Sequence, residues 1–303
     1  MKLVLFGSKG QLGTELKTQL SKLYDIQAYS RDEVDITNES SVKHILYTLK
    51  PNIVINAAAY TNVEQSEQEK SSAVKINTDA VCHLASICEQ IDALLIHYST
   101  DYVFDGNKPS DYLETDQPNP INVYGSSKLG GENAIQASGC RHIIFRTSWV
   151  IGRQGKNFAK IILNLAQEKE ALTVINDQLG APTSVKLISK VTIEAVHSIQ
   201  HNNTPWENGI YHLSSKGSTN WHEMATTMIA HASKISDLKF KTSIKNIKAI
   251  NTEDYPSKVK RPLNSRLNIN KLQAKLSFEL PDWREDFICI INDILKEETI
   301  YEA

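Results

Sequence analysis

The sequence predicts an α/β fold, a doubly wound parallel sheet followed by a smaller α/β domain. Short apolar runs recur through the first half of the chain, each separated from the next by enough residues for a crossover helix. A glycine-rich turn directly follows the first run. After about residue 150 this alternation weakens, and turn-rich pieces interrupt longer helical patterns. Together these observations predict one helix-covered sheet and a second packing unit.

Four apolar runs are predicted to be strands of the sheet: LVLF at 3–6, IVINAA at 53–58, LLIHYS at 94–99 and HIIFRTS at 142–148. The first helix is predicted from Leu12, Leu16 and Leu20, which recur every four residues. In the second half, helices are predicted near 156–169, 184–200, 220–234 and 283–297, with NDQLGAPTS and ENGIY as turns between them. We expect a first domain over residues 1–148 and a second mainly over 149–303, with some segments returning to the first.

Composition excludes several classes of function. The 33 Lys and Arg against 35 Asp and Glu give a formal net charge of -2, which argues against a protein that coats nucleic-acid phosphates. No run approaches the ~18 apolar residues of a membrane-spanning helix, and the start, MKLVLFGSKG, is too short in apolar residues for a signal peptide. The four cysteines form no C-x-x-C pair. We expect a cytoplasmic protein with reduced thiols and no membrane contact.

The glycine turn has the spacing of a dinucleotide-binding loop. Gly7, Gly10 and Gly13 lie between the first predicted strand and the first predicted helix. Glycines permit the sharp turn and a close backbone approach, and a helix N-terminus favours an anionic pyrophosphate. A plain glycine turn is the alternative, but strand, loop and helix follow in the required order. The sequence therefore predicts a Rossmann-type sheet.

Charged residues after the second strand bear on the choice of dinucleotide. That strand is expected to end near Tyr29, without the acidic residue that binds a ribose 2'-hydroxyl, whereas Arg31 could face a 2'-phosphate. This favours NADPH. Because Asp32, Glu33 and Asp35 lie close by, NADH stays possible.

A tyrosine and a lysine four residues apart suggest a catalytic acid. On a helix Tyr124 and Lys128 would share one face, and an ammonium beside a phenol lowers the phenol's pKa. With 11 tyrosines in the chain, such a pair also arises by chance. Thr100 makes a chance pairing less credible. It directly follows the LLIHYS run, at the sheet edge where ligands of such folds bind, and its hydroxyl can donate to a carbonyl oxygen. Together with the glycine loop, Thr100 favours a site over a chance pairing of Tyr124 and Lys128.

At this point the sequence resembles the extended short-chain dehydrogenase/reductases, almost from end to end. The collinear motifs that carry the resemblance are FGSKGQLGTEL, INAAAYTNVEQSE, HYSTDYVFDG, NVYGSSKLGGE, FRTSWVIG, NFAK, VINDQLGAPTS, GIYHL and RPLNSRL. It implies a dinucleotide-binding first domain and a substrate-binding second domain. It also implies reduction of a nucleotide-sugar ketone by NAD(P)H, the C4 ketone of dTDP-4-dehydro-L-rhamnose giving dTDP-L-rhamnose.

The resemblance assigns roles to residues that match its motifs. Tyr124 is implied as the proton donor, with Lys128 as its electrostatic partner and ribose ligand. Pyrophosphate, adenine and cleft contacts are implied for Gly10, Gln11, Leu12, Asp35, Ile36, Ala59, Tyr60 and Thr61. Sugar-nucleotide contacts are implied for Thr100, Asp101 and Trp149. Arg261 is a candidate for gripping the substrate diphosphate, because guanidinium binds phosphate oxygens in pairs; a solvated surface position is its alternative.

Several alternatives remain open from the residues. The same scaffold serves a non-catalytic regulatory subunit, and Asp101 beside Thr100 also suits an epimerase or dehydratase. A homodimer is possible. Some relatives use a divalent metal between subunits, with Glu15 as a candidate ligand, but Lys186 stands where a further carboxylate is expected, so we expect no metal. His222 and Glu223 lack the second histidine of a zinc helix, and Asn220 with Glu223 predicts a helix cap instead.

Overall fold

A six-stranded parallel sheet forms the centre of the molecule. The computed structural model describes residues 1–201 and 206–301. Along the sheet the strand order is β10-β5-β4-β3-β1-β2, and every neighbouring pair is parallel. The strands are β1 (Lys2–Phe6), β2 (Asp25–Tyr29), β3 (Ile53–Asn56), β4 (Leu94–Thr100), β5 (His142–Thr147) and β10 (Gly209–Leu213). β3, β4 and β5 are buried along their whole length, as expected of strands covered on both faces.

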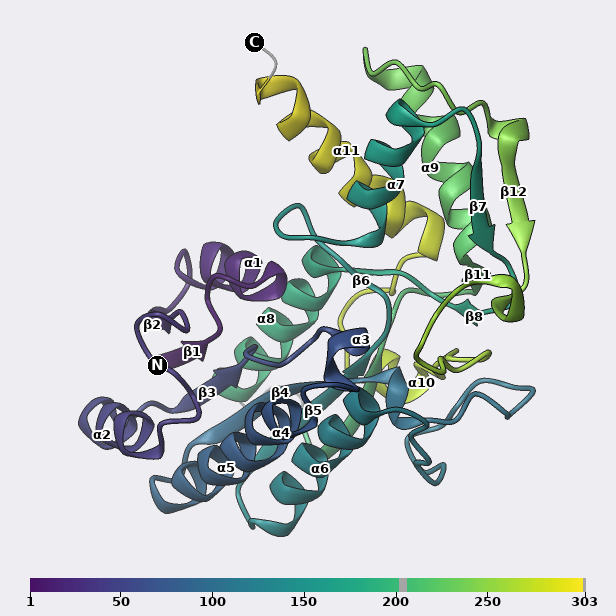
Figure 1. The fold of residues 1–303 in the computed structure, drawn as a ribbon. Coiled ribbons are helices and arrows are strands. Elements are labelled where there is room, and N and C mark those ends of the chain that lie inside the picture. Colours follow the sequence, from purple (N-terminus) through teal and green to yellow (C-terminus); the bar gives the residue numbers. More distant parts are fainter. Residues whose placement is uncertain (202–205, 302–303) are drawn as a thin grey trace.

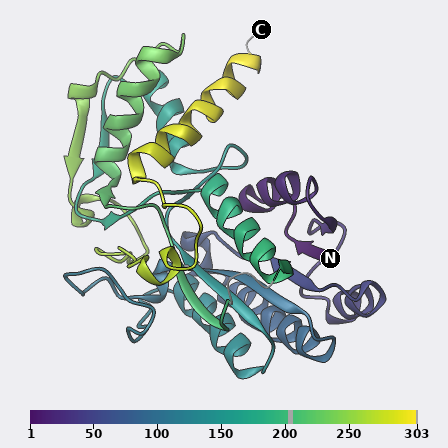
Figure 2. The ribbon, with the colours of Figure 1, turned by 180° about the vertical axis from the view of Figure 1, so that it is seen from behind.

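Helices cover both faces of the sheet (Figures 1 and 2). On one face α1 (Gln11–Leu20) packs beside α8 (Val185–His201), and their apolar residues join those of β1 and β3 in one cluster. On the other face α2 (Glu39–Leu49), α5 (Ala80–Gln90) and α6 (Val123–Ala137) pack in a row. Alternate residues of β1, Leu3 and Val4 for example, belong to the two different clusters, so the molecule is a three-layer α/β/α sandwich.

A second lobe lies beyond the carboxyl edge of the sheet (Figure 1). It contains α7 (Phe158–Glu168), α9 (Trp221–Ile235) and α11 (Trp283–Tyr301) around a cluster of their own, with β7 (Leu172–Ile175) parallel to β12 (Ile247–Ile250). Short pairs connect the lobes: β6 (Val150–Ile151) with β9 (Thr183–Ser184), and β8 (Leu179–Gly180) with β11 (Thr219–Asn220). The remaining short elements are α3 (Val63–Ser66), α4 (Lys70–Val74), the π-helical turn η1 (Lys75–Asp79), η2 (Asp101–Val103), η3 (Ile244–Asn246), η4 (Thr252–Asp254) and α10 (Asn270–Gln273).

The structure confirms most predicted elements, but both segments predicted as turns contain strand residues: NDQLGAPTS includes β8 and β9, and ENGIY runs into β10. All four apolar runs are strands, and each of the four helices predicted in the second half is present within a few residues. The prediction of a turn at ENGIY was wrong, because Gly209–Leu213 is β10 and pairs with β5 at the end of the sheet. Asn220 caps α9 as predicted, accepting from the Glu223 amide at 2.8 Å, but the Glu223 carboxylate binds the Thr219 hydroxyl at 2.7 Å.

The strand order places a ligand site at one point of the sheet. The chain moves from β1 outward to β2 and then crosses to β3 on the other side of β1. Loops leaving β1 and β3 therefore run in opposite directions and leave a crevice at their carboxyl ends.

Candidate active site

A cleft of about 200 Å³ opens at this crevice. One side is the loop after β1, and the other is the backbone that follows β3. Its lining residues are Gly7, Lys9, Gly10, Arg31, Val34, Asp35, Ile36, Ala57, Ala58, Ala59 and Ile76. The walls are thus mostly small or apolar, with two cationic side chains and one carboxylate at the edge, a composition suited to a flat heterocycle that carries phosphate.

Backbone contacts in the glycine loop leave no room for side chains. Gly7 has a φ of +84°, and a Cβ there would lie 2.6 Å from the Ala58 nitrogen. A Cβ on Gly13 would lie 2.0 Å from the Gly7 carbonyl oxygen. Gly10 is the N-cap of α1 and supplies no side-chain hydrogen bond to the first turn. The N-terminal amides of α1 therefore lie at the cleft in the arrangement that binds an anion.

Acidic residues after β2 are largely engaged by neighbours. The Glu33 carboxylate accepts from the Ser30 amide at 2.8 Å and its hydroxyl at 2.7 Å, which holds the pKa of Glu33 below its usual range. Asp32 forms an exposed ion pair with Lys9 at 2.8 Å. Asp35 accepts from the Thr37 amide at 2.9 Å. Arg31 lies at the cleft, so a phosphate beside it would meet a cation.

The loop after β3 is held by one buried amide. Asn77, in η1, accepts from the Tyr60 amide at 2.9 Å and donates to the Tyr60 carbonyl at 3.0 Å. The same Asn77 nitrogen lies 3.0 Å from the Ser127 hydroxyl on α6. The segment Ala59–Tyr60–Thr61 is thereby fixed relative to α6, the helix that carries the tyrosine and lysine pair.

Thr100 and Asp101 lie where β4 ends and η2 begins. Both are buried, and the Thr100 hydroxyl donates to Asp101 Oδ1 at 2.9 Å. The second carboxylate oxygen of Asp101 is buried without a partner. Burial raises the pKa of Asp101 to about 7, although the nearby hydroxyls of Ser265 and Thr100 oppose the shift. This carboxyl can therefore gain or lose a proton near neutral pH.

Tyr124 lies in the first turn of α6, and its hydroxyl is close enough to Thr100 for that residue to influence its pKa. Lys128 follows one turn later on the same face, as predicted. The predicted fall in the tyrosine's pKa is wrong for this structure. The phenol is partly exposed but lies deep among protein atoms, and desolvation raises the pKa of Tyr124 to about 12.

Lys128 points to β4, which explains why it does not lower the phenol's pKa. Its ammonium nitrogen lies 2.6 Å from the Tyr98 carbonyl oxygen and 3.2 Å from His97 Nε2. Only 2% of the residue is exposed, and burial lowers the pKa of Lys128 to about 8. Glu132 opposes that shift, yet its carboxylate is bound by the Arg146 guanidinium at 2.6 Å.

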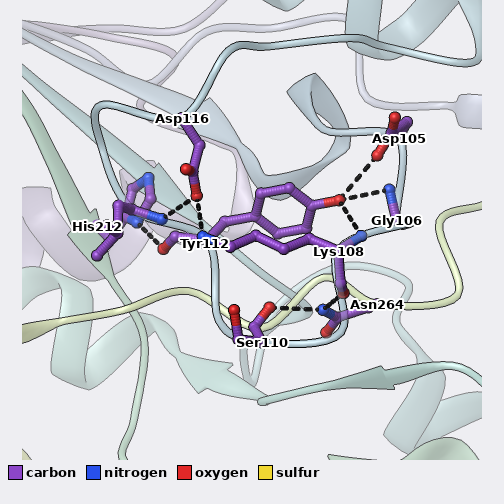
Figure 3. Close-up of polar contacts among 9 residues, drawn as sticks. Asp105, Gly106, Lys108, Ser110, Tyr112, Asp116, His212 and Asn264 are labelled. Atoms are coloured by element: carbon purple, nitrogen blue, oxygen red, sulfur yellow. Dashed lines mark hydrogen bonds and ion pairs between the residues drawn. The ribbon is translucent and has the colours of Figure 1, made fainter.

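The loop from Asp105 to Asn119 connects Thr100 to Tyr124, and Tyr112 holds it together (Figure 3). The Tyr112 hydroxyl donates to Asp105 at 2.8 Å and accepts from the amides of Gly106 at 3.0 Å and Lys108 at 3.2 Å. Its ring stacks on Phe104 with centroids 4.1 Å apart. The loop thus closes around one buried phenol.

Two distant segments anchor the same loop (Figure 3). His212 of β10 donates from Nδ1 to the Tyr112 carbonyl at 3.1 Å, and the Asn264 amide donates to the Ser110 carbonyl at 2.9 Å. Asp116 binds the Lys108 ammonium and accepts from the Leu113 amide. These anchors fix the loop that lies in the chain between Thr100 and Tyr124.

Comparison with known proteins assigns the chain to a family. The family model described as RmlD substrate binding domain matches residues 1–296. The chain is 39% identical over 304 residues to the dTDP-4-dehydrorhamnose reductase of Escherichia coli (strain K12), covering 99% of this chain and 100% of the relative. It is 38% identical over 299 residues to that of Burkholderia thailandensis, covering 98% and 100%. The chain belongs to the dTDP-4-dehydrorhamnose reductase family.

Solved structures agree with that family. The dTDP-4-dehydrorhamnose reductase of Bacillus anthracis str. Ames, solved in complex with NADP, superimposes with a TM-score of 0.87 at 33% identity, covering 96% of this chain and 99% of that one. A UDP-glucose 4-epimerase of Thermus thermophilus, solved with NAD, superimposes with a TM-score of 0.78 at 17% identity and 97% and 99% coverage. The epimerase shares the fold, which confirms the predicted Rossmann-type α/β class.

Within this dTDP-4-dehydrorhamnose reductase family fold, Trp149 lies between the lobes. It follows β5 with a φ of +45°, and its indole stacks on Trp221 with centroids 3.8 Å apart. A Cβ on Gly180 would lie 2.7 Å from the same indole. Arg261 pairs with Glu64 at 3.1 Å, and its Nε is buried without a partner. Substrate contacts by Trp149 and Arg261 stay predictions.

Gln11 and Leu12 begin α1 beside the second lobe. The Gln11 side-chain oxygen accepts from the Gly152 amide at 3.2 Å and from Asn157 at 2.9 Å. Leu12 packs against the apolar clusters of both lobes. Both side chains therefore fix the second lobe against the glycine loop, and their predicted pyrophosphate contacts would come from the backbone.

The structure also describes the surroundings of the metal candidate. Lys186 binds Asp293, which raises the pKa of this lysine against the effect of burial, and Glu15 adds a smaller contribution in the same direction. Among the described residues no group of three or more His, Cys, Asp and Glu side chains is placed to hold a metal ion. His222 instead contacts the Ile247 carbonyl through Nε2 at 3.0 Å.

No helix within residues 1–201 and 206–301 is long and apolar enough to cross a membrane.

Three buried residues of the site were not predicted from the sequence: Asn56, Asn77 and His97. Asn56 and His97 lie within apolar runs that were assigned to strands, and Asn77 lies in a helical stretch. A polar side chain inside an otherwise buried run is the signal that could have identified the first two, because it must find a partner there.

Proposed function

We propose that this protein reduces the C4 ketone of dTDP-4-dehydro-L-rhamnose to dTDP-L-rhamnose with NADPH. One observation carries the proposal: Thr100, which is hydrogen-bonded to Asp101, lies beside Tyr124 one helical turn from Lys128, in a chain that matches reductases of this name over its whole length. A regulatory protein that only bound a dinucleotide would not need a tyrosine acid and its lysine together.

The glycine cleft fits the dinucleotide. The close backbone contacts at Gly7 and Gly13 leave the α1 amides free of side chains, and Ile36 and Ala59 offer apolar walls for the adenine. Arg31 at the same cleft favours the 2'-phosphate of NADPH. When bound, NADPH supplies the hydride for the C4 carbonyl carbon.

The residues of this chain supply the proton and stabilise the negative charge that develops on the carbonyl oxygen. Tyr124, kept protonated by its raised pKa, donates its proton to the carbonyl oxygen. Thr100 donates a hydrogen bond to the same oxygen and so stabilises the charge. For this its hydroxyl must leave Asp101, and the carboxyl, with a pKa of about 7, can instead be protonated and donate to Thr100.

The proposed boundary between the two domains, at residues 148 and 149, separates the binding of the dinucleotide from the binding of the sugar nucleotide. Residues 1–148 would bind the dinucleotide, and residues 149–303 would mainly bind the sugar nucleotide, with β10 as a segment of the second part in the main sheet. The proposal also places the enzyme in the cytoplasm, and the four cysteines, which are free thiols, suit a reducing compartment.

The test is the oxidation of NADPH by the purified protein, followed by absorbance. We expect oxidation only when dTDP-4-dehydro-L-rhamnose is supplied, with dTDP-L-rhamnose as the product. Tight dinucleotide binding without turnover would favour the regulatory subunit, and conversion of the sugar without net NADPH oxidation would favour an epimerase or dehydratase.

A further inference from the structure

Three buried side chains from neighbouring elements form a line that ends at Lys128. Asn56 of β3 and His97 of β4 are register partners, and Asn56 Nδ2 lies 3.2 Å from His97 Nδ1. The other ring nitrogen, Nε2, lies 3.2 Å from Lys128 Nζ. Asn56 and Lys128 are at most 2% exposed and His97 is fully buried, so water does not supply alternative partners.

The orientation of the Asn56 amide is fixed at its oxygen. The Ala58 backbone amide, which can only donate, lies 3.1 Å from Asn56 Oδ1. The atom that faces His97 is therefore the amide nitrogen, which also can only donate. His97 Nδ1 must accept this hydrogen bond, so it carries no proton.

The proton of the imidazole then lies on Nε2. A neutral ring has one donor and one acceptor nitrogen. The doubly protonated ring is disfavoured, because burial and the charge of Lys128 hold the pKa of His97 well below its usual range. His97 Nε2 therefore donates toward Lys128 Nζ, and a nitrogen that accepts must have a lone pair. An amine has one and an ammonium does not.

Of the other groups around Lys128, Glu132 opposes this arrangement without reversing it. The Tyr98 carbonyl accepts from either form of the amine. Glu132, one turn along α6, would favour the cation, but Arg146 of β5 binds both of its oxygens. Tyr124 is protonated, and Asp101 on η2 is hydrogen-bonded to Thr100. From η1 the uncharged Asn77 and Thr78 bind the neighbouring residue, Ser127.

We propose that Asn56 and His97 are positioning residues that weaken the proton affinity of Lys128 and so shift its equilibrium toward the neutral amine in the free protein. The lowered pKa of Lys128 places the exchange of this proton within reach of ordinary buffers. This next step rests on the proposed function, in which Lys128 acts as a cation beside Tyr124. Loss of the Lys128 proton then ends turnover at high pH, so the chain of hydrogen bonds sets the upper pH limit of turnover.

The test uses the free protein and needs neither sugar nucleotide nor dinucleotide, so it stands apart from the test of the reductase. Nitrogen-15 NMR of labelled histidine reports which ring nitrogen of His97 is protonated, and carbon-13 at the lysine Cε reports the pKa of Lys128. Signals are assigned by their loss in His97→Leu and Lys128→Met. We expect the His97 proton on Nε2 in the wild-type protein; a proton on Nδ1 overturns the proposal without any further variant.

Asn56→Asp is the matched variant, because it keeps the shape and replaces the donor with an acceptor. We expect the His97 proton to move to Nδ1 and the Lys128 pKa to rise by about one unit or more, at least a tenfold gain in proton affinity. Asn56→Ala, which adds no charge, should raise it by less. A carboxylate also acts directly through its field, so the same change is made in the His97→Leu background. In the His97→Leu background, Asn56→Asp should raise the Lys128 pKa by less than half as much as in the wild-type background. An equal rise in both would show that the carboxylate attracts the Lys128 proton directly, and the proposed role of His97 would be overturned.

A pH profile gives an independent readout in the active enzyme. The fall of kcat at high pH should move upward in Asn56→Asp by the shift measured for Lys128. A profile that keeps its position while kcat falls at every pH would show that Asn56 only supports the fold of the site.

Discussion

The surroundings of Tyr124 keep the proton on its phenol in the free protein. Its pKa is raised to about 12 by desolvation, so the phenol is fully protonated at neutral pH. Tyr124→Phe removes the proton and keeps the ring. We expect kcat to fall by about 10² to 10⁴, the contribution of a positioned acid, while NADPH affinity changes little.

A second tyrosine provides the control for this change. Tyr211 is buried in β10, where its hydroxyl binds the Glu207 carbonyl at 3.0 Å, outside the site. Tyr211→Phe should keep most of the activity, since it removes the same atom elsewhere. If Tyr124→Phe retained more than half of the wild-type kcat, Tyr124 would not be the acid.

Asp101 makes the stability of the protein depend on pH. Its pKa is about 7 in the folded protein and 3.8 by default, so between these values the folded state binds more protons than the unfolded state. Stability from this residue is therefore lost as pH rises toward and past 7. Asp101→Asn removes the charge. Its free energy of unfolding relative to wild type should increase by about 2 to 3 kcal/mol between pH 5 and pH 8.

Urea unfolding at the two pH values measures this difference. The comparison between pH values matters more than either value, because the substitution also alters the hydrogen bond from Thr100. A difference that does not change with pH would mean that Asp101 is ionised normally in the folded protein.

We expect the choice between NADPH and NADH to depend on Arg31, which lines the cleft. A charge-assisted contact with the 2'-phosphate is worth about 1.5 to 3 kcal/mol, which is about 10- to 100-fold in affinity. Arg31→Ala should lower kcat/KM for NADPH by that factor and leave NADH nearly unchanged. Lys9, already paired with Asp32, offers a comparison: Lys9→Ala should change the ratio less. Equal kcat/KM for both dinucleotides in the wild-type protein would contradict the role of Arg31.

At the scale of elements, the junction of β1 and α1 depends on one glycine more than on another. A methyl group on Gly13 would meet the fixed backbone of Gly7 at 2.0 Å, whereas one on Gly10 would have 3.3 Å. Gly13→Ala must therefore displace the loop, at a cost of about 1 to 3 kcal/mol in stability. We expect it to abolish dinucleotide binding, measured by calorimetry. Gly10→Ala should weaken binding far less, and equal losses would show that backbone contact is not the cause.

The sequence predicted those elements whose pattern is local. β1, β3, β4 and β5 each contain an apolar run bounded by polar residues, and α1 has a regular four-residue repeat. β10 was missed because it begins with Gly209, whose φ is +145°, and because its partner β5 lies more than sixty residues earlier. Pairing at that distance leaves no periodic signal in a short strand.

The same limit applies inside the candidate site. Tyr124 and Lys128 were found from their spacing, because a helix fixes which side chains share a face. The direction of the pKa shift of Tyr124 was not predicted correctly. It depends on how deeply the phenol is buried and on where the lysine side chain points. His97 lies in the interior of an apolar run, and only the register of β3 with β4 shows that it meets Asn56.

At the scale of the whole molecule, the two lobes meet at the glycine loop and at Trp149. Gln11 at the start of α1 accepts hydrogen bonds from Gly152 and Asn157 of the second lobe. Trp149, directly after β5, stacks on Trp221 of α9. A sugar nucleotide that bridges the lobes would therefore meet one wall made by the dinucleotide and another made by aromatic side chains.

This arrangement predicts that the two ligands bind together more tightly than apart. Titration with dTDP-L-rhamnose should change the tryptophan emission at micromolar to millimolar concentration, with a lower Kd when NADP is present, because each ligand completes the site of the other. The change should vanish in Trp149→Phe and persist in Trp221→Phe, which keeps the reporting indole. Calorimetry on both variants separates loss of the signal from loss of binding. A protein that bound NADP and gave no response to the sugar nucleotide by either method would be a dinucleotide-binding regulator, and the reductase proposal would fail with it.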